Sequence, residues 1–119
     1  MATYKREDLI RRALRMLDVV SATEAPEAED YEDCQEYLQS LMETLHGDGL
    51  IPFDLDGDEI PAPFYIPLAQ KLAYKLVPEY GLFGAREVSL ATYDVDATRA
   101  LYRLNAKPYS GSILKAEYF

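Results

Sequence analysis

The sequence is poor in the residues that build disulfide or metal frameworks. Cys34 is its single cysteine, His46 its single histidine, and tryptophan is absent. One cysteine excludes an intrachain disulfide framework and a cysteine-based zinc site, and one histidine excludes a histidine-rich metal site. With only 6 glycines and 7 prolines in 119 residues, collagen-like and low-complexity chains are also excluded. The 49% hydrophobic content indicates one globular domain.

Long apolar runs are missing as well, so no segment is predicted to span a bilayer. The first residues, 1–6, lead directly into a charged amphipathic segment without the apolar region of a signal peptide. We therefore expect a soluble protein made in a reducing compartment.

Negative charge is concentrated in the middle of the chain. The net charge is −9, yet residues 21–60 hold thirteen acidic and no basic side chains, whereas residues 1–20 and 61–119 each carry a net charge of +2. Proteins that hold DNA usually show a basic patch, because neutralised phosphates release counterions and supply most of the affinity. We expect no tight DNA binding through the acidic segment.

Apolar side chains at three- and four-residue spacing predict helices over residues 4–20 and 26–46. Thr3 is the expected N-cap of the first helix, and Gly47 is the expected C-cap of the second. The apolar stripe of the first helix comprises Leu9, Ile10, Ala13, Leu14, Leu17 and Val20. The stripe of the second comprises Tyr31, Cys34, Leu38, Leu41, Met42 and Leu45.

A third helix is predicted from Pro63 or Pro67 to Tyr80, with a kink or early end near Pro78. A fourth is predicted over residues 85–105. Its expected core-facing row is Val88, Ala91, Val95, Thr98 and Tyr102, with Ala97, Leu101 and Leu104 beside it.

Residues 48–62 and 107–119 lack a helical period. The first segment is interpreted as a long acidic loop, with room for a short extended piece, and the second as an extended C-terminal arm. The predicted fold class is therefore all-α: a single domain of about four helices over residues 1–106, followed by the arm over residues 107–119.

No group of residues forms a convincing catalytic or metal site. The segment from Asp54 resembles the start of a calcium loop, but positions six and twelve, which require Gly and Glu, are Glu59 and Tyr65. Cys34 lies on an apolar stripe, where a free thiol is usually a small core residue. His46 lies in a last helical turn, which suits a cation. We expect no catalytic, cofactor-binding or metal-binding residues and no enzyme activity.

Protein contacts are the better interpretation of the remaining features. Arg11 and Arg12 each follow an acidic residue by four positions, which favours an ion-paired solvent or subunit face over a nucleic-acid face. Ten tyrosines are many for this length, and tyrosine is enriched where proteins meet. The apolar side chains of the arm predict either a partner surface or an arm that folds back on its own domain.

Three stretches carry a family resemblance: Lys5–Leu17, Leu41–Ile51 and Leu68–Gly81. With the proline-bearing loop, the final helix and the tail beginning at Lys107, they resemble the head-to-tail adaptor proteins of tailed bacteriophages. The most similar type is the packaged-DNA stabilisation, or head-completion, family of short-tailed phages. The resemblance covers nearly the whole chain and rests on helical pattern and short strings.

The resemblance implies a structural virion protein made in the bacterial host cytoplasm and located at the portal vertex, the head-tail junction. It implies a ring, commonly of twelve copies, that binds the portal protein and a downstream tail or nozzle protein. Genomic double-stranded DNA would pass through without sequence-specific binding, and no membrane is involved. An acidic wall would repel that DNA, so the DNA would not bind to the wall of the conduit.

The resemblance also implies roles for particular residues. The arm is the expected portal-binding segment, with the contacts assigned to Lys107, Tyr109, Ile113, Leu114, Lys115, Tyr118 and Phe119. The candidates for a subunit interface or the lumen are Arg11, Arg12, Arg15, Glu29, Asp30, Asp33 and Glu36.

Two other functions fit parts of the sequence. An acidic DNA mimic that binds the basic site of a host DNA-binding protein suits the charge and size, but does not need the apolar arm or the tyrosine-rich surfaces. A metal-dependent hydrolase using the acidic loop over residues 54–59 would respond to added divalent ions.

Overall fold

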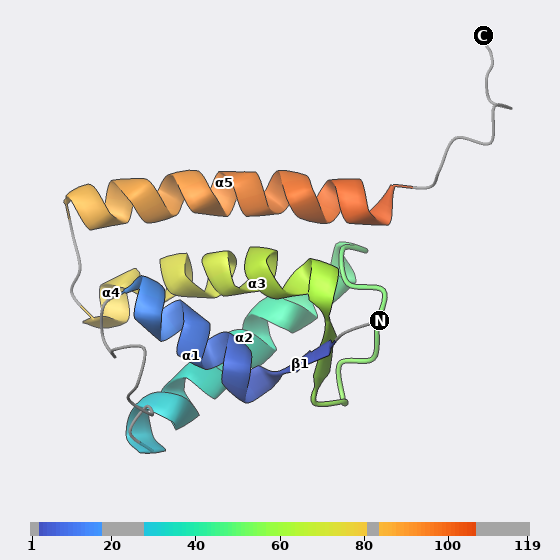
Figure 1. Ribbon diagram of the computed structural model, residues 1–119, viewed down its shortest axis with the longest axis horizontal. Helices are drawn as coiled ribbons and strands as arrows, with labels where there is room; N and C mark the ends of the chain where they lie inside the picture. The colour runs from blue at the N-terminus through green and yellow to red at the C-terminus, as the bar shows by residue number, and fades with distance from the viewer. Residues whose placement is uncertain (1–2, 18–27, 81–83, 107–119) are drawn as a thin grey trace, which may run out of the picture.

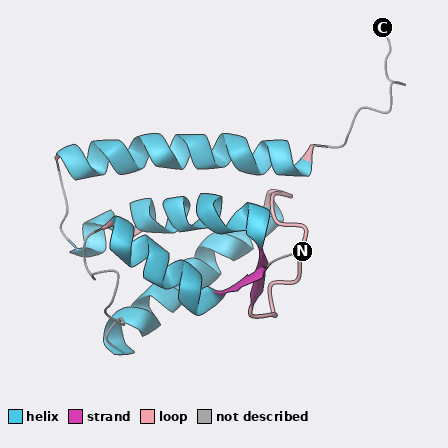
Figure 2. Ribbon diagram, in the orientation of Figure 1, coloured by secondary structure: helices cyan, strands magenta, loops and turns pink. Residues whose placement is uncertain are grey.

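The computed structural model describes residues 3–17, 28–80 and 84–106, which form an all-α domain with one small sheet (Figures 1 and 2). The all-α prediction is confirmed. In chain order the elements are β1 (Thr3–Lys5), α1 (Arg6–Met16), α2 (Ala28–Gly47), β2 (Glu59–Pro61), α3 (Ala62–Lys75), α4 (Val77–Tyr80) and α5 (Ala85–Asn105).

The helix α3 lies in the middle of the domain, with α5 along one side and α1 and α2 on the other (Figure 1). Its apolar stripe meets all of these neighbours: Leu68, Ala69, Leu72, Ala73 and Leu76 have no exposed surface. A helix placed in this way is apolar over most of its circumference.

The predicted stripes of the first two helices also lie in the core. Their buried members are Leu9, Ile10, Ala13, Leu14 and Leu17 from α1 and the turn after it, and Cys34, Leu38, Leu41, Met42 and Leu45 from α2. Tyr31 is partly buried against this core, and Val20 lies outside the described residues.

The start of α1 differs from the prediction. Thr3 does not cap the helix but belongs to β1, which pairs antiparallel with β2 so that Tyr4 lies opposite Ile60 (Figure 2). The helix begins at Arg6, and the Lys5 backbone N–H donates to the Asp8 carboxylate at 3.1 Å. A three-residue strand is too short to show the alternation by which strands are recognised in sequence.

The end of α2 is capped two residues later than predicted. Gly47 is still helical, and Gly49 adopts the left-handed conformation at φ 78°. The Gly49 N–H donates to the His46 carbonyl at 3.0 Å and the Leu50 N–H donates to the Leu45 carbonyl at 2.9 Å. This is the Schellman arrangement, which brings the buried Leu50 back onto the buried Leu45.

The third predicted helix is divided into two pieces. The first piece, α3, begins at Ala62 and ends at Lys75, and α4 follows directly after Leu76. Pro78 lacks the N–H that would continue the α3 ladder, so the predicted early end is confirmed. The short α4 raises the number of helices among the described residues to five.

The fourth predicted helix is present as α5, but it is rotated relative to the expected row. Ala97 and Leu101 are buried as expected, together with Leu90, and Ala91 and Thr98 are partly buried. Val88, Val95 and Tyr102, expected in the same row, are exposed. A polar contact with α3, described below, lies on the buried side.

Among the described residues, no helix is both long and apolar enough to cross a membrane. The arm over residues 107–119 lies outside the described residues.

Candidate interaction surfaces

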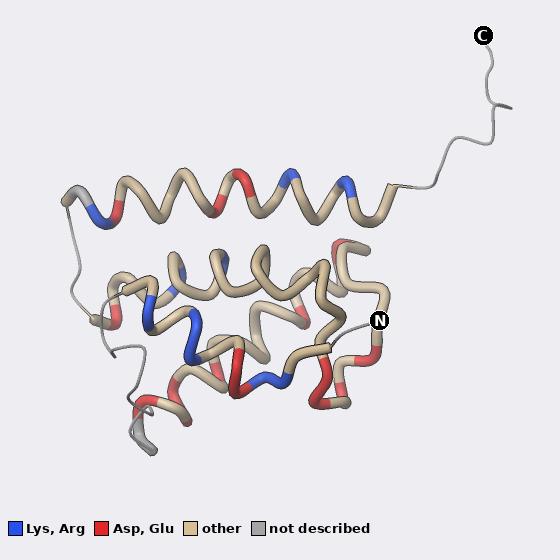
Figure 3. Tube along the Cα trace, in the orientation of Figure 1, with Lys and Arg blue, Asp and Glu red and all other residues tan. Residues whose placement is uncertain are grey.

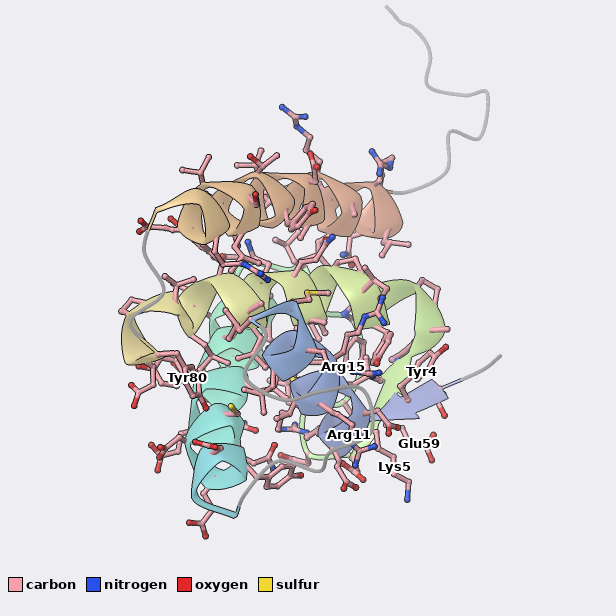
Figure 4. The ribbon with its side chains drawn as sticks, turned by 60° about the vertical axis from the view of Figure 1, so that its left-hand side comes forward. Tyr4, Lys5, Arg11, Arg15, Glu59 and Tyr80 are labelled. Carbon is pink, nitrogen blue, oxygen red and sulfur yellow. The ribbon has the colours of Figure 1, made fainter. Side chains whose placement is uncertain are left out.

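Arg11 and Arg15 project from the side of α1 that faces away from α2 (Figure 4). Arg11 donates to the Glu7 carboxylate at 3.1 Å, so the predicted ion pair with the residue four positions earlier is confirmed. Arg12 is exposed. The Asp8 carboxylate, expected to pair with Arg12, accepts the Lys5 backbone N–H instead.

Two stacked tyrosines lie beside these arginines. The ring centroids of Tyr4 and Tyr65 are 3.9 Å apart, and the two ring planes are inclined by 15°. The Tyr65 hydroxyl donates to the Asp8 carbonyl at 3.2 Å. Burial raises the pKa of Tyr65, while the positive charges of Arg12 and Arg15 act in the opposite direction. Arg12 and Arg15, with the two tyrosines, therefore give one side of α1 a basic and aromatic character.

A shallow pocket of about 480 Å³ opens where the end of α1 meets the start of α5. Arg15 and Arg86 both line it, together with Met16 and Tyr93. Arg86 donates to the Met16 carbonyl at 2.5 Å and so ties the two helices together. The buried Nε of Arg15 has no hydrogen-bond partner within the described part of the chain.

The acidic candidates lie on α2 and differ from one another in surroundings (Figure 3). Asp30 is half-buried and accepts the Tyr80 hydroxyl at 3.2 Å, which gives it a role within the fold. Asp33 and Glu36 are exposed and line one hollow, separate from the arginines. Glu29 belongs to α2, but its side chain lies outside the described residues.

Cys34 is fully buried beside Tyr80. Burial raises the pKa of the Cys34 thiol to about 11, with a smaller opposing effect from its hydrogen bond with Tyr80. Burial also raises the pKa of Tyr80, and the neighbouring Cys34 and Asp30 add to this effect. At neutral pH the thiol is therefore protonated and packs as a small core residue, as predicted.

Arg6 is a residue that the sequence interpretation missed. It is 7% exposed and binds the loop ahead of β2: its guanidinium donates to the Gly57 carbonyl at 3.3 Å, to the Leu55 carbonyl, and to Gln39 Oε1 at 2.6 Å. Its backbone N–H reaches Asp58. The acidic loop is thus fixed to α1 and α2 by one buried cation.

The acidic loop does not gather into a metal site within the described residues. There, no group of three or more histidine, cysteine, aspartate or glutamate side chains is placed to hold a metal ion. Asp54 accepts the backbone N–H of Asp56 at 3.0 Å, a local turn interaction.

Lys71 and Asp94 form the polar contact that orients α5. Lys71 Nζ lies 3.0 Å from the Asp94 carboxylate and donates to the Thr98 hydroxyl at 2.7 Å, and Lys71 is only 9% exposed. The Thr98 hydroxyl in turn donates to the Asp94 carbonyl. A lysine within the apolar stripe of the third helix, and an aspartate between Leu90 and Ala97, were the sequence signals for this pair.

The consequence is an exposed apolar row along α5. Val88 is 66% exposed, Val95 51% and Tyr102 60%, and the three repeat every seven residues, so they lie on one side of the helix. Tyr93 and Leu104 are also exposed. We call Val88, Val95 and Tyr102 the α5 row.

The predicted portal-binding residues, Lys107 to Phe119, lie outside the described residues. Comparison with family models, with curated proteins and with solved structures finds no match for this chain.

Proposed function

We propose that this protein is a structural virion protein, a head-to-tail adaptor that assembles as a ring beneath the portal of a tailed bacteriophage. In that place it retains packaged DNA, forms part of the DNA conduit and provides the platform for tail attachment. The proposal rests on the resemblance of the sequence and on one feature of the fold, the α5 row.

The α5 row carries the proposal because it has no use in an isolated domain. Exposed apolar side chains aligned along one side of a helix mark a surface that another protein can cover. The separation of acidic groups on α2 from the arginines of α1 adds two further surfaces of opposite charge (Figures 3 and 4). A ring subunit needs several contact surfaces, since it meets two neighbours, a portal and a tail component.

The acidic DNA mimic remains the second candidate, and exposed carboxylates on α2 favour it. A mimic needs acidic groups spaced like phosphates, and it needs neither the α5 row nor an apolar arm. Binding to a basic host DNA-binding protein, competed away by duplex DNA, would support the mimic.

Particle imaging of the phage that carries this gene tests the adaptor proposal. We expect density for a ring of this chain at the portal vertex. Its absence from the vertex contradicts the proposal.

Truncation after Ala106 tests the role of the arm. Because α5 ends at Asn105, we expect the shortened chain to keep its helical content and melting temperature. We expect it to be lost from particles, because the arm carries the proposed portal contacts. Normal incorporation shows that the arm is not the anchor, and unfolding shows that the arm belongs to the core.

A further inference from the structure

Apolar exposure among the described residues is concentrated on one helix. Seven large apolar side chains are exposed, and α5 carries five of them. Arg99 extends the α5 row: it lies four residues after Val95 and three before Tyr102, so it is a surface neighbour of both. Its side chain is 73% exposed, and Arg103 follows one turn later. Asp96 lies on the same edge, 3.9 Å from Arg99, so the row is apolar with two arginines and one aspartate along its edge and a net positive charge there.

A groove of the opposite charge runs along α2. Two adjoining hollows of about 390 and 250 Å³ share Tyr37 and Ser40. We call them together the α2 groove. The three carboxylates Asp33, Glu36 and Glu79 line the first hollow, and the single cation Lys75 lines the second, so the groove is negative overall and most negative in the first hollow.

The α2 groove combines carboxylates with an aromatic ring. Tyr37 donates to the Glu79 carboxylate at 3.1 Å, which links α2 to α4 and fixes the ring. This hydrogen bond and the negative charges of Glu79 and Asp33 raise the pKa of Tyr37. Carboxylates beside an aromatic ring suit an arginine, which pairs with the former and stacks on the latter.

The α5 row and the α2 groove cannot meet within one chain. The helices α5 and α2 lie on opposite sides of α3 (Figure 1), and the buried pair of Lys71 and Asp94 holds α5 in place. A second copy of the chain is the occupant whose charge matches the groove and whose apolar side chains need cover.

We propose that the α5 row of one copy docks in the α2 groove of a second copy, with Arg99 and Arg103 facing Asp33 and Glu36. Because the two surfaces differ, an assembly of any length has an open row at one end and an open groove at the other. Such an assembly either closes into a ring or continues as a filament. The contact specifies how the proposed ring is held together, and only the closure of the ring rests on the proposed function.

Charge exchange tests the contact directly. One double variant reverses the row (Arg99→Glu with Arg103→Glu), and another reverses the groove (Asp33→Lys with Glu36→Lys). We expect sedimentation equilibrium up to about 1 mM protein to show self-association of the natural chain and at least tenfold weaker association of each double variant. We expect a chain with all four changes, and an equimolar mixture of the two double variants, to recover association to within about threefold.

The matched control reverses an exposed charge elsewhere: Asp48→Lys, after α2, should leave association within about twofold. Arg12→Glu tests the rival face on α1. Circular dichroism should show unchanged helicity and melting for every variant. A natural chain that stays monomeric at about 1 mM overturns the proposal. The proposal is also overturned if the row variant weakens association and the groove variant does not, because that result indicates pairing of α5 with α5. Weakening by Arg12→Glu alone places the contact on α1.

The outcomes separate this contact from the proposed function. If charge exchange restores association but no ring is found at the portal vertex, the contact stands and the adaptor function fails. If the ring is present and the double variants associate and enter particles normally, the function stands and the contact is wrong.

Discussion

Replacing Lys71 by methionine tests how much the polar contact between α3 and α5 stabilises the domain. The substitution keeps most of the length of the side chain but removes the charge that faces Asp94 and Thr98. Breaking a fully buried ion pair costs about 3–5 kcal/mol, and because the Asp94 side chain is 24% exposed, we expect a smaller loss of about 2–3 kcal/mol. Most of that loss comes from leaving Asp94 desolvated without a partner.

A double-variant cycle followed by urea unfolding measures this effect. We expect Lys71→Met with Asp94→Leu to lie within about 1 kcal/mol of the natural chain, because an apolar pair avoids the unpaired charge. Lys75→Met, at the exposed end of α3, is the matched control and should change stability by less than about 0.5 kcal/mol. A Lys71→Met loss as small as the control's, or a double variant as unstable as the sum of the single ones, refutes the reasoning.

Three further predictions follow from buried or charged groups. Arg6→Met should lower the free energy of unfolding by about 2–3 kcal/mol and speed protease cleavage of the loop before β2, because two loop carbonyls lose a charged donor. Arg12→Met, an exposed control, should change neither the stability nor the cleavage rate. Burial raises the pKa of Cys34 from 9.0 to about 11, so the buried thiol stabilises the fold fully below pH 9, and this contribution is lost as the pH rises to 11. The urea midpoint of a Cys34→Ala chain should therefore fall less between pH 9 and pH 11 than that of the natural chain. Fluorescence anisotropy should detect no binding of duplex DNA at physiological salt, and salt-sensitive micromolar binding would direct attention to Arg11, Arg12 and Arg15.

The sequence predicts the helices well because each buries a regular stripe. The stripes of α1, α2 and α3 and the bounds of α5 follow from spacing alone, and Pro78 correctly predicts the end of α3. The errors lie where a local signal competes with a distant contact. Thr3 is a good cap residue, but pairing with Pro61 places it in a strand. Gly47 is the cap expected from the sequence, but Gly49, two residues later, adopts the left-handed conformation that ends α2.

The candidate surfaces were harder to predict, since they depend on which side of a helix meets the core. The helix α5 has two apolar rows, and the one with valines at regular spacing is the stronger in sequence. The row containing Leu90, Asp94, Ala97 and Leu101 faces α3 instead, where Lys71 pairs with Asp94. Nothing local to α5 reveals that partner, so Val88, Val95 and Tyr102, in the row assigned to the core, are the side chains left exposed.

The exposed row also sets the strength of any contact made through it. Burying a valine or tyrosine completely contributes about 1.5–3 kcal/mol, and Val88, Val95 and Tyr102 are already partly covered, so the row contributes only a few kcal/mol. Association itself costs about 4–15 kcal/mol, so arginine pairing with the α2 groove has to supply the rest, and one contact is weak. A chain built this way stays a monomer or small oligomer at micromolar concentration. It assembles when a template holds neighbouring copies together, because each copy then binds at a high effective concentration. A stable ring of the purified protein alone at micromolar concentration would show that the contact is stronger than this row and groove can provide.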